Sequence, residues 1–124
     1  MSEARRVLVT GASGLVGAWV TQALCAQPER FRVRVLVRSR DKLARALAPL
    51  GVDVETLEVA EGDITDAAAV ARAVVDCGAV VHCAGLYSAD VTELALLTKT
   101  NVTGTQIVLD AARAAGADPV VHVS

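Results

Sequence analysis

Hydrophobic and polar positions along the chain follow two different periodicities. Short runs in which Val and Leu are continuous or occupy every second position predict five strands, at 5–10, 31–37, 52–59, 79–83 and 120–123. Between these runs apolar residues recur every three or four positions, which predicts helices over 15–26, 41–50, 66–75 and about 91–115. Asp41 is placed to cap the second helix, and Gly116 follows the end of the fourth.

The regular alternation of strands and helices predicts the fold class. Right-handed crossovers make such strands parallel, so we expect one α/β domain over 1–124, a doubly wound parallel sheet of five strands. The composition agrees, because 53% of the residues are apolar and only 2% are aromatic. A core built from Val, Leu, Ile and Ala is typical of buried parallel strands covered by helices.

Charge and cysteine content narrow the function classes. The net charge is −2 with acids and bases interspersed, which predicts no basic face for nucleic acid or for an anionic membrane. No apolar run approaches the roughly 20 residues needed to cross a bilayer. Cys25, Cys77 and Cys83 lack the CxxC spacing, so we expect reduced thiols and a cytoplasmic protein.

The stretch TGASGLVG, from Thr10 to Gly17, places three glycines directly behind the first predicted strand. A sharp turn from strand to helix points the free amides of the helix at whatever lies above it, which suits a pyrophosphate. The first glycine permits the turn, the second the close approach of phosphate, and the third the packing of helix on strand. The alternative is a glycine turn without a ligand. The predicted dinucleotide contacts in this loop are Gly11, Ser13, Gly14, Leu15, Val16 and Gly17.

These residues resemble the TGxxGxxG loop of the extended branch of the short-chain dehydrogenase/reductase superfamily. Four further motifs match the branch in order. They are GDITD at 62–66, similar to GDxxD; VVHCAG at 80–85, similar to VxHxAA; NVTGTQIVLDAA at 101–112, similar to NVxGTxxxLxAA; and VVHVS at 120–124, the strand that leads to a catalytic serine. The resemblance implies a Rossmann-type domain of an NAD(P)-dependent oxidoreductase, similar to epimerases and dehydratases, dihydroflavonol reductases and 3-beta-hydroxysteroid dehydrogenases.

The resemblance also assigns site residues beyond the glycine loop. Asp63 would accept a hydrogen bond from the adenine amino group, with the backbone of Ile64 beside the ring. The strand-end residues Cys83, Ala84 and Gly85 would adjoin the nicotinamide ribose, because the last two are small. Asn101 would support the active site. Two alternatives remain: Asp63 as an ordinary turn residue, and Asn101 as a polar residue on a helix surface.

His82 is interpreted as a structural histidine on a buried strand rather than as a ligand. A metal site formed by His82, Cys83 and His122 is not expected, because adjacent residues on a strand face opposite sides of the sheet.

The end of the second predicted strand bears on the choice of cofactor. After Val37 come Arg38, Ser39 and Arg40, and no acid stands where one would bind the ribose hydroxyls of NAD. A guanidinium binds phosphate through charge-assisted hydrogen bonds, and the hydroxyl of Ser39 can contribute another. The segment therefore favours NADP over NAD, the alternative being a solvated basic loop.

The catalytic residues that the resemblance implies are a serine, a tyrosine and a lysine four residues after it, but the chain contains no YxxxK. Its single tyrosine is Tyr87, with Val91 four residues later, and Ser124 is the final residue. We therefore expect the truncated cofactor-binding part of a longer enzyme that acts on a small-molecule substrate. A noncatalytic nucleotide sensor and a sugar-nucleotide epimerase or dehydratase are the alternatives. The resemblance also suggests a homodimer paired through the helix that contains Asn101.

Overall fold

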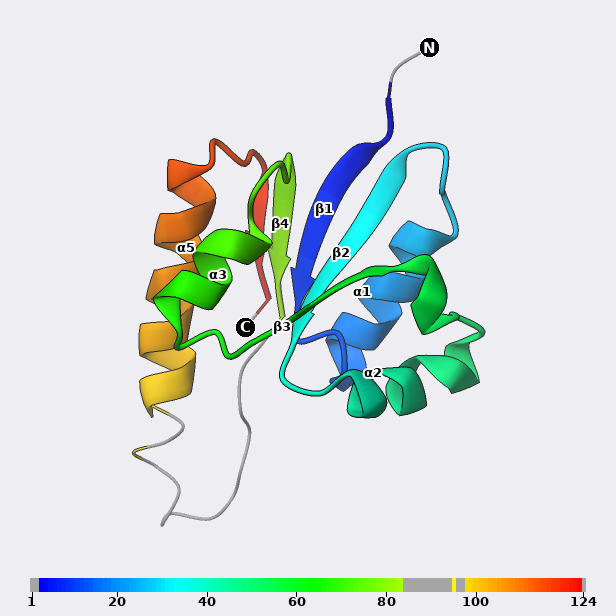
Figure 1. The fold of residues 1–124 in the computed structure, drawn as a ribbon, viewed down its shortest axis with the longest axis horizontal. Coiled ribbons are helices and arrows are strands. Elements are labelled where there is room, and N and C mark those ends of the chain that lie inside the picture. The colour runs from blue at the N-terminus through cyan, green and yellow to red at the C-terminus, as the bar shows by residue number, and fades with distance from the viewer. Residues whose placement is uncertain (1–2, 84–94, 96–97, 124) are drawn as a thin grey trace.

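The computed structural model describes residues 3–83, 95 and 98–123. Its centre is a parallel sheet of five strands in the order β3-β2-β1-β4-β5 (Figure 1). The strands are β1 (Arg5–Thr10), β2 (Phe31–Val37), β3 (Glu58–Glu61), β4 (Ala79–His82) and β5 (Val120–His122). This arrangement confirms the predicted doubly wound α/β fold.

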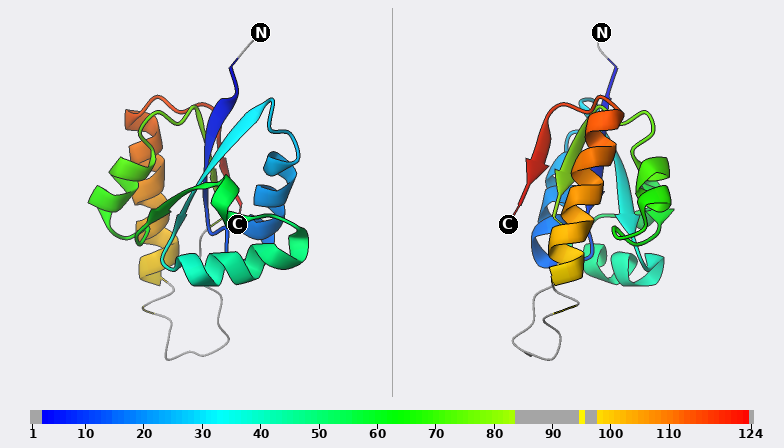
Figure 2. Two further views of the ribbon diagram at one scale, coloured as in Figure 1. Left: turned by 45° about the vertical axis from the view of Figure 1, so that its right-hand side comes forward. Right: turned by 90° about the vertical axis from the view of Figure 1, so that its left-hand side faces the viewer.

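Helices cover both faces of the sheet, as the two views of Figure 2 show. The helices are α1 (Leu15–Cys25), α2 (Arg40–Leu47), α3 (Ala67–Ala73) and α5 (Thr105–Ala114), with a π-helical turn at Lys99–Gly104 and 3-10 turns at Ala48–Leu50 and Val54–Thr56. Side chains alternate along a strand, so β1 contributes to two cores. Val7 and Val9 pack with α1 and α2, whereas Leu8 packs with α3 and α5.

Several predicted boundaries differ from the structure, and two of the differences have an identifiable local cause. The third strand begins at Glu58 rather than at residue 52, because the side chain of Asp53 accepts a hydrogen bond from the amide of Glu55 at 2.9 Å and starts a 3-10 turn. Helix α2 is capped by Ser39 rather than by Asp41, which lies in the first turn. In both cases a local hydrogen bond from a side chain to the backbone moves the boundary of the element.

The predicted helix over 91–115 is only partly described. Residues 84–94 and 96–97 lie outside the described residues. The described part has a π-helical turn before α5, and α5 ends at Ala114.

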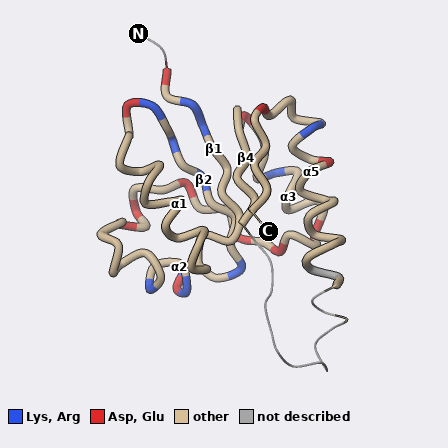
Figure 3. Tube along the Cα trace, turned by 180° about the vertical axis from the view of Figure 1, so that it is seen from behind, with Lys and Arg blue, Asp and Glu red and all other residues tan. Residues whose placement is uncertain are grey.

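Acidic and basic residues are interspersed over the fold (Figure 3). No helix within the described ranges is long and apolar enough to cross a membrane. The same ranges contain no cluster of three or more His, Cys, Asp or Glu side chains that suits a metal ion.

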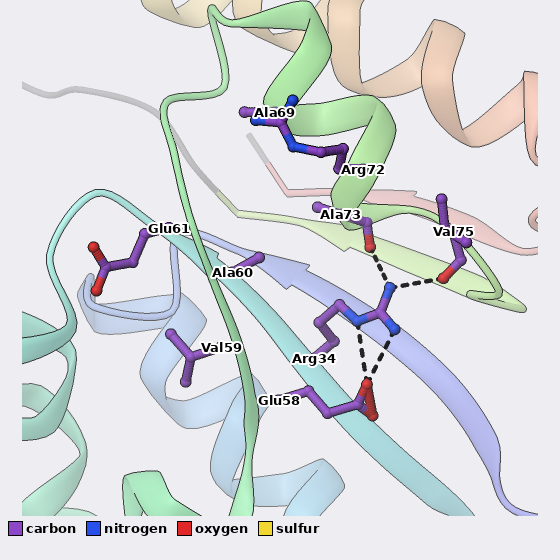
Figure 4. Close-up of a pocket in the computed structure, with 9 residues that line it drawn as sticks. All are labelled: Arg34, Glu58, Val59, Ala60, Glu61, Ala69, Arg72, Ala73 and Val75. Atoms are coloured by element: carbon purple, nitrogen blue, oxygen red, sulfur yellow. Dashed lines mark hydrogen bonds and ion pairs between the residues drawn. The ribbon is translucent and has the colours of Figure 1, made fainter.

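A partly exposed ion cluster joins the neighbouring strands β1, β2 and β3. Glu58 on β3 accepts from Arg6 on β1 at 3.1 Å and from Arg34 on β2 at 3.0 Å. Arg34 also donates to the carbonyl oxygens of Ala73 and Val75, at 2.8 and 2.7 Å, where α3 ends (Figure 4). The arginine thus satisfies carbonyl groups that a helix end leaves without partners.

The carboxyl group of Glu58 responds to two opposing influences. Burial raises its pKa, but hydrogen bonds and charge from Arg6 and Arg34 outweigh burial, and the net pKa lies below the usual value. The ionised carboxylate is therefore the form that the fold favours.

We predict that Glu58→Gln lowers the free energy of unfolding by about 1 kcal/mol, because it removes the charge that pairs with both arginines. Solvent partly screens the cluster, which keeps the loss small. The matched control is Glu55→Gln, which removes the exposed pair that Glu55 forms with Arg40 at 3.1 Å. We expect that control to cost less than about 0.5 kcal/mol. Denaturant unfolding of both variants near neutral pH measures the difference, and equal losses would contradict the structural role of the cluster.

Candidate functional site

The candidate site lies at the carboxyl edge of the sheet, where the chain reverses its direction of winding. The chain passes from β1 outward through β2 to β3, then returns to β4 and β5 on the other side of β1. In open parallel sheets ligands bind outside the carboxyl ends of the strands at such a reversal. The loops that follow β1, β2, β3 and β4 therefore define the site.

The loop after β1 has the tight geometry that its glycines predict. Gly11 has a φ of +73°, in the left-handed region that favours glycine. The amide of Gly14 donates to the carbonyl of Gly11 at 3.0 Å, which closes the turn. A Cβ atom on Gly17 would lie 1.9 Å from the same carbonyl oxygen. Helix α1 therefore packs against the turn at a distance that only glycine permits.

The first turn of α1 is open to an external acceptor. Gly14 is the N-cap residue, no described side chain caps it, and the first turn contains no acid. Leu15 and Val16 beside it are 79% and 49% exposed, so apolar cover does not bury the amides. Ser13 is half-buried next to them. Free amides and the positive end of the helix dipole suit a phosphate group.

The two arginines after β2 are in different states. Arg38 is exposed and makes no hydrogen bond or ion pair with any residue of the described ranges. Arg40 instead pairs with Glu55 at 3.1 Å. The hydroxyl oxygen of Ser39 accepts from the amide of Lys42 at 3.2 Å as the cap of α2. Arg38 is therefore a cation available to a ligand at this strand end.

The turn after β3 is fixed in place by its own contacts. The Oδ1 atom of Asp63 accepts from the amide and from the hydroxyl of Thr65, both at 2.9 Å. Ile64 is buried, and a Cβ on Gly104, the last residue of the π-helical turn before α5, would lie 2.6 Å from the Cδ1 atom of Ile64. Glycine at position 104 therefore lets the start of α5 pack closely against the turn that follows β3.

The end of β4 contains the buried His82, which confirms the prediction of a structural histidine. Its Nδ1 lies 2.6 Å from the hydroxyl of Thr10 and its Nε2 2.9 Å from the hydroxyl of Thr105. Burial, with a smaller contribution from the stacked ring of His122 at 5.2 Å, lowers the pKa of His82 to about 4. The imidazole is therefore neutral near pH 7. Sequence reasoning gave no role to either threonine, because nothing local to His82 indicates them.

Burial likewise raises the pKa of the half-buried Cys83 thiol. A raised pKa disfavours the thiolate, so Cys83 is not an activated nucleophile. Its amide donates to the carbonyl and to the hydroxyl of Thr10, both at 3.1 Å, which ties the ends of β1 and β4 together.

The remaining predicted residues differ in how far the structure describes them. Asn101 lies exposed in the π-helical turn before α5. Ala84, Gly85 and Ser124 lie outside the described residues. The glycine loop, Arg38, the turn at 63–64 and Cys83 do gather at one edge of the sheet, although they come from four separate loops.

The parallel sheet and its glycine turn define a Rossmann-type α/β fold of the short-chain dehydrogenase/reductase class. Residues 7–124 match the family model described as the NAD dependent epimerase/dehydratase family. The chain belongs to that family, within the extended short-chain dehydrogenases/reductases.

Curated relatives include a dTDP-glucose 4,6-dehydratase of Streptomyces antibioticus, 36% identical over 122 residues, which covers 95% of this chain and 36% of the relative. Cinnamoyl-CoA reductase 1 of Oryza sativa subsp. japonica is 34% identical over 122 residues, covering 98% of this chain and 35% of the relative. The chain thus spans about a third of the length of these curated relatives.

Solved structures agree with this assignment. A double mutant of the dTDP-glucose 4,6-dehydratase DesIV from Streptomyces venezuelae, with NAD and DAU bound, is 38% identical with a TM-score of 0.78, and the match covers 96% of this chain and 39% of that one. A short-chain dehydrogenase/reductase superfamily protein from Agrobacterium tumefaciens with bound NAD is 31% identical with a TM-score of 0.73, covering 97% and 32%.

We predict that Gly17→Ala lowers the free energy of unfolding by about 2 kcal/mol or more, because the new methyl group overlaps the carbonyl of Gly11. Gly14→Ala is the matched control. Its Cβ would lie 3.4 Å from the same oxygen, an ordinary contact, so we expect a loss of about 1 kcal/mol or less from the poorer cap. Thermal or denaturant unfolding compares the two, and equal stability of both variants would contradict the close packing described here.

We also predict that stability falls as the pH falls from about 6.5 toward about 4, the interval between the ordinary pKa of histidine and that of His82. In this interval the unfolded chain binds a proton at His82 that the folded chain does not, which favours unfolding. At about 1.4 kcal/mol for each pKa unit, the loss approaches about 3 kcal/mol at its acid limit.

Unfolding by denaturant across this pH range measures the effect, with His82→Gln as the control. The carboxylates titrate in both proteins, so their contribution largely cancels in the difference. We expect a flatter pH dependence for the variant, whereas parallel curves would show that His82 does not carry the effect.

Proposed function

We propose that this chain binds NADP along the carboxyl edge of its sheet, in an oxidoreductase that acts on a carbonyl or secondary alcohol of a small-molecule substrate. The observation that carries the proposal is the first turn of α1, which follows the carboxyl end of β1 and whose amides have no described side-chain cap. A dinucleotide brings two phosphates, and this turn offers the amides and the helix dipole that bind them.

The pyrophosphate is assigned to the glycine loop. Gly14 leaves room for the phosphates, and the amides of Leu15 and Val16 donate to their oxygens. Ser13 adds a hydroxyl donor. The side chains of Leu15 and Val16 are exposed beside this position and can lie against the dinucleotide.

The adenosine half is assigned to the ends of β2 and β3. Asp63 accepts from the adenine amino group, and the backbone of Ile64 lies beside the ring. Arg38 binds the additional phosphate of NADP, because its guanidinium has no described partner and no acid follows Val37. Ser39 keeps its hydroxyl hydrogen available while its oxygen caps α2.

The nicotinamide half is assigned to the end of β4, at Cys83, Ala84 and Gly85. When bound, the nicotinamide supplies or accepts a hydride. Asn101 supports the active site, and Ser124 is its candidate catalytic serine. The tyrosine and lysine of the proton relay are not among these 124 residues, so the reaction is proposed for the protein of which this chain forms the dinucleotide-binding part.

A second candidate function is a sugar-nucleotide dehydratase or epimerase. It is favoured by the 36% identity to a dTDP-glucose 4,6-dehydratase and by the NAD named in the solved structure of a similar enzyme. The two candidates differ in the expected cofactor. Tighter binding of NADH than of NADPH would favour the dehydratase or epimerase.

We predict that the 124-residue chain binds NADPH more tightly than NADH, and that Arg38→Ala weakens NADPH binding by about 10- to 100-fold, as expected for a charge-assisted phosphate contact. NADH binding should stay nearly unchanged. Arg45→Ala, which removes an equal charge from an exposed position in the last turn of α2, is the control. Fluorescence titration measures the affinity of the wild type and of each variant for NADPH and for NADH. Equal affinities of the wild type for the two dinucleotides would overturn the NADP assignment.

A further inference from the structure

The imidazole of His82 bridges two elements that border the proposed dinucleotide site. It is fully buried, and each ring nitrogen faces one threonine hydroxyl. Thr10 ends β1, and Thr105 begins α5. The bridge therefore spans from the central strand of the sheet to a helix that covers one of its faces.

On the side of β1, the bridge reaches the residue that precedes the glycine loop. Thr10 is followed by Gly11, whose positive φ turns the chain toward α1. The hydroxyl oxygen of Thr10 also accepts from the amide of Cys83 at 3.1 Å. The position of Thr10 therefore sets where the glycine loop leaves the sheet.

On the side of α5, the bridge reaches the residue that follows the contact with the β3 turn. Gly104 precedes Thr105 and packs closely on the side chain of Ile64, which would have to shift to admit a Cβ at position 104. Ile64 in turn follows Asp63, the proposed adenine contact. A displacement of the start of α5 would therefore move the adenine end of the site.

Both ring nitrogens lie at hydrogen-bonding distance from a threonine hydroxyl, Nδ1 at 2.6 Å from Thr10 and Nε2 at 2.9 Å from Thr105. A threonine hydroxyl can donate or accept, so either neutral tautomer of the imidazole satisfies both contacts. A neutral imidazole has one acceptor and one donor, which matches this arrangement.

We propose that His82 is a positioning residue for dinucleotide binding, which acts through Thr10 on the glycine loop and through Thr105 on the turn at Asp63 and Ile64. This inference rests on the proposed function. It assigns to His82 no contact with the dinucleotide: the bridge holds the pyrophosphate and adenine parts of the site at the spacing that one ligand requires.

Thr105→Val is the decisive variant, because Thr105 lies on the far side of His82 from the glycine loop. We expect Thr10→Val and Thr105→Val each to raise the Kd for NADPH by about tenfold, as the loss of one buried hydrogen bond predicts. Thr10→Ser and Thr105→Ser retain the hydroxyl and should restore binding to within about threefold. Fluorescence titration gives the Kd values, and denaturant unfolding of each variant gives its stability.

Two controls separate positioning from general loss of stability. Val80→Ala removes buried apolar contacts from the same strand without touching the bridge, and should lower stability while leaving Kd unchanged. In a His82→Phe background, Thr105→Val should add no further effect on Kd, because the bridge is already broken.

The outcomes distinguish the inference from the proposed function. If the wild type binds neither NADPH nor NADH, the proposed function fails and the inference fails with it. If the wild type binds and Thr105→Val binds equally well, or if Val80→Ala weakens binding as much as Thr105→Val does, the inference alone is overturned.

Discussion

The close approach of α1 to the end of β1 is the constraint on which the site depends. Gly17 touches the carbonyl of Gly11 with no room for a side chain, so helix and turn are held together by backbone contact. A flexible side chain between them would let the helix tilt, whereas two backbones in contact have one packing distance. The direction of the first amides of α1 is therefore set by the same contact that completes the fold.

The same edge of the sheet is where the apolar core gives way to polar groups. Thr10, His82 and His122 are register partners on β1, β4 and β5, so they form one row across the carboxyl end of the sheet. One residue pair earlier in the register, Val9 and Val81 face the other side, and Leu8 and Val80 are fully buried beneath the row. His122 is exposed, whereas Thr10 and His82 are buried and are tolerated there because they hydrogen-bond to each other. Hydrogen-bonded polar side chains thus lie between the apolar core and the proposed ligand site.

How far the sequence predicts this structure depends on the range of the interactions involved. The bounds of β1 and β2 follow from their apolar pattern alone, because both strands are covered by a core on each face. The pattern fails at β3, where Val52 and Val54 continue an apolar alternation but Asp53 starts a turn. It also fails at α2, because Ser39 and Asp41 are both suitable caps and only the backbone geometry selects one.

The same distinction between local and long-range interactions explains which parts of the candidate site were predictable. The glycine loop was predictable because its residues are contiguous and each has a local reason to be there. The partners of His82 were not, since Thr10 lies 72 residues before it and Thr105 23 residues after it. A buried histidine is expected to have hydrogen-bond partners, but the sheet register and the packing of α5 determine which residues these are.

Cofactor choice is a still more local property, and membership of the family does not determine it. The similar structures with NAD bound share the fold of this chain, whereas the ribose of a dinucleotide is recognised at the end of the second strand of such a sheet. In this chain that strand end has three polar residues in a row with distinct roles. Ser39 caps α2 and Arg40 pairs with Glu55, which leaves Arg38 as the side chain that the fold itself does not use. The proposed function assigns this side chain to the additional phosphate of NADP, because a guanidinium forms charge-assisted hydrogen bonds with phosphate.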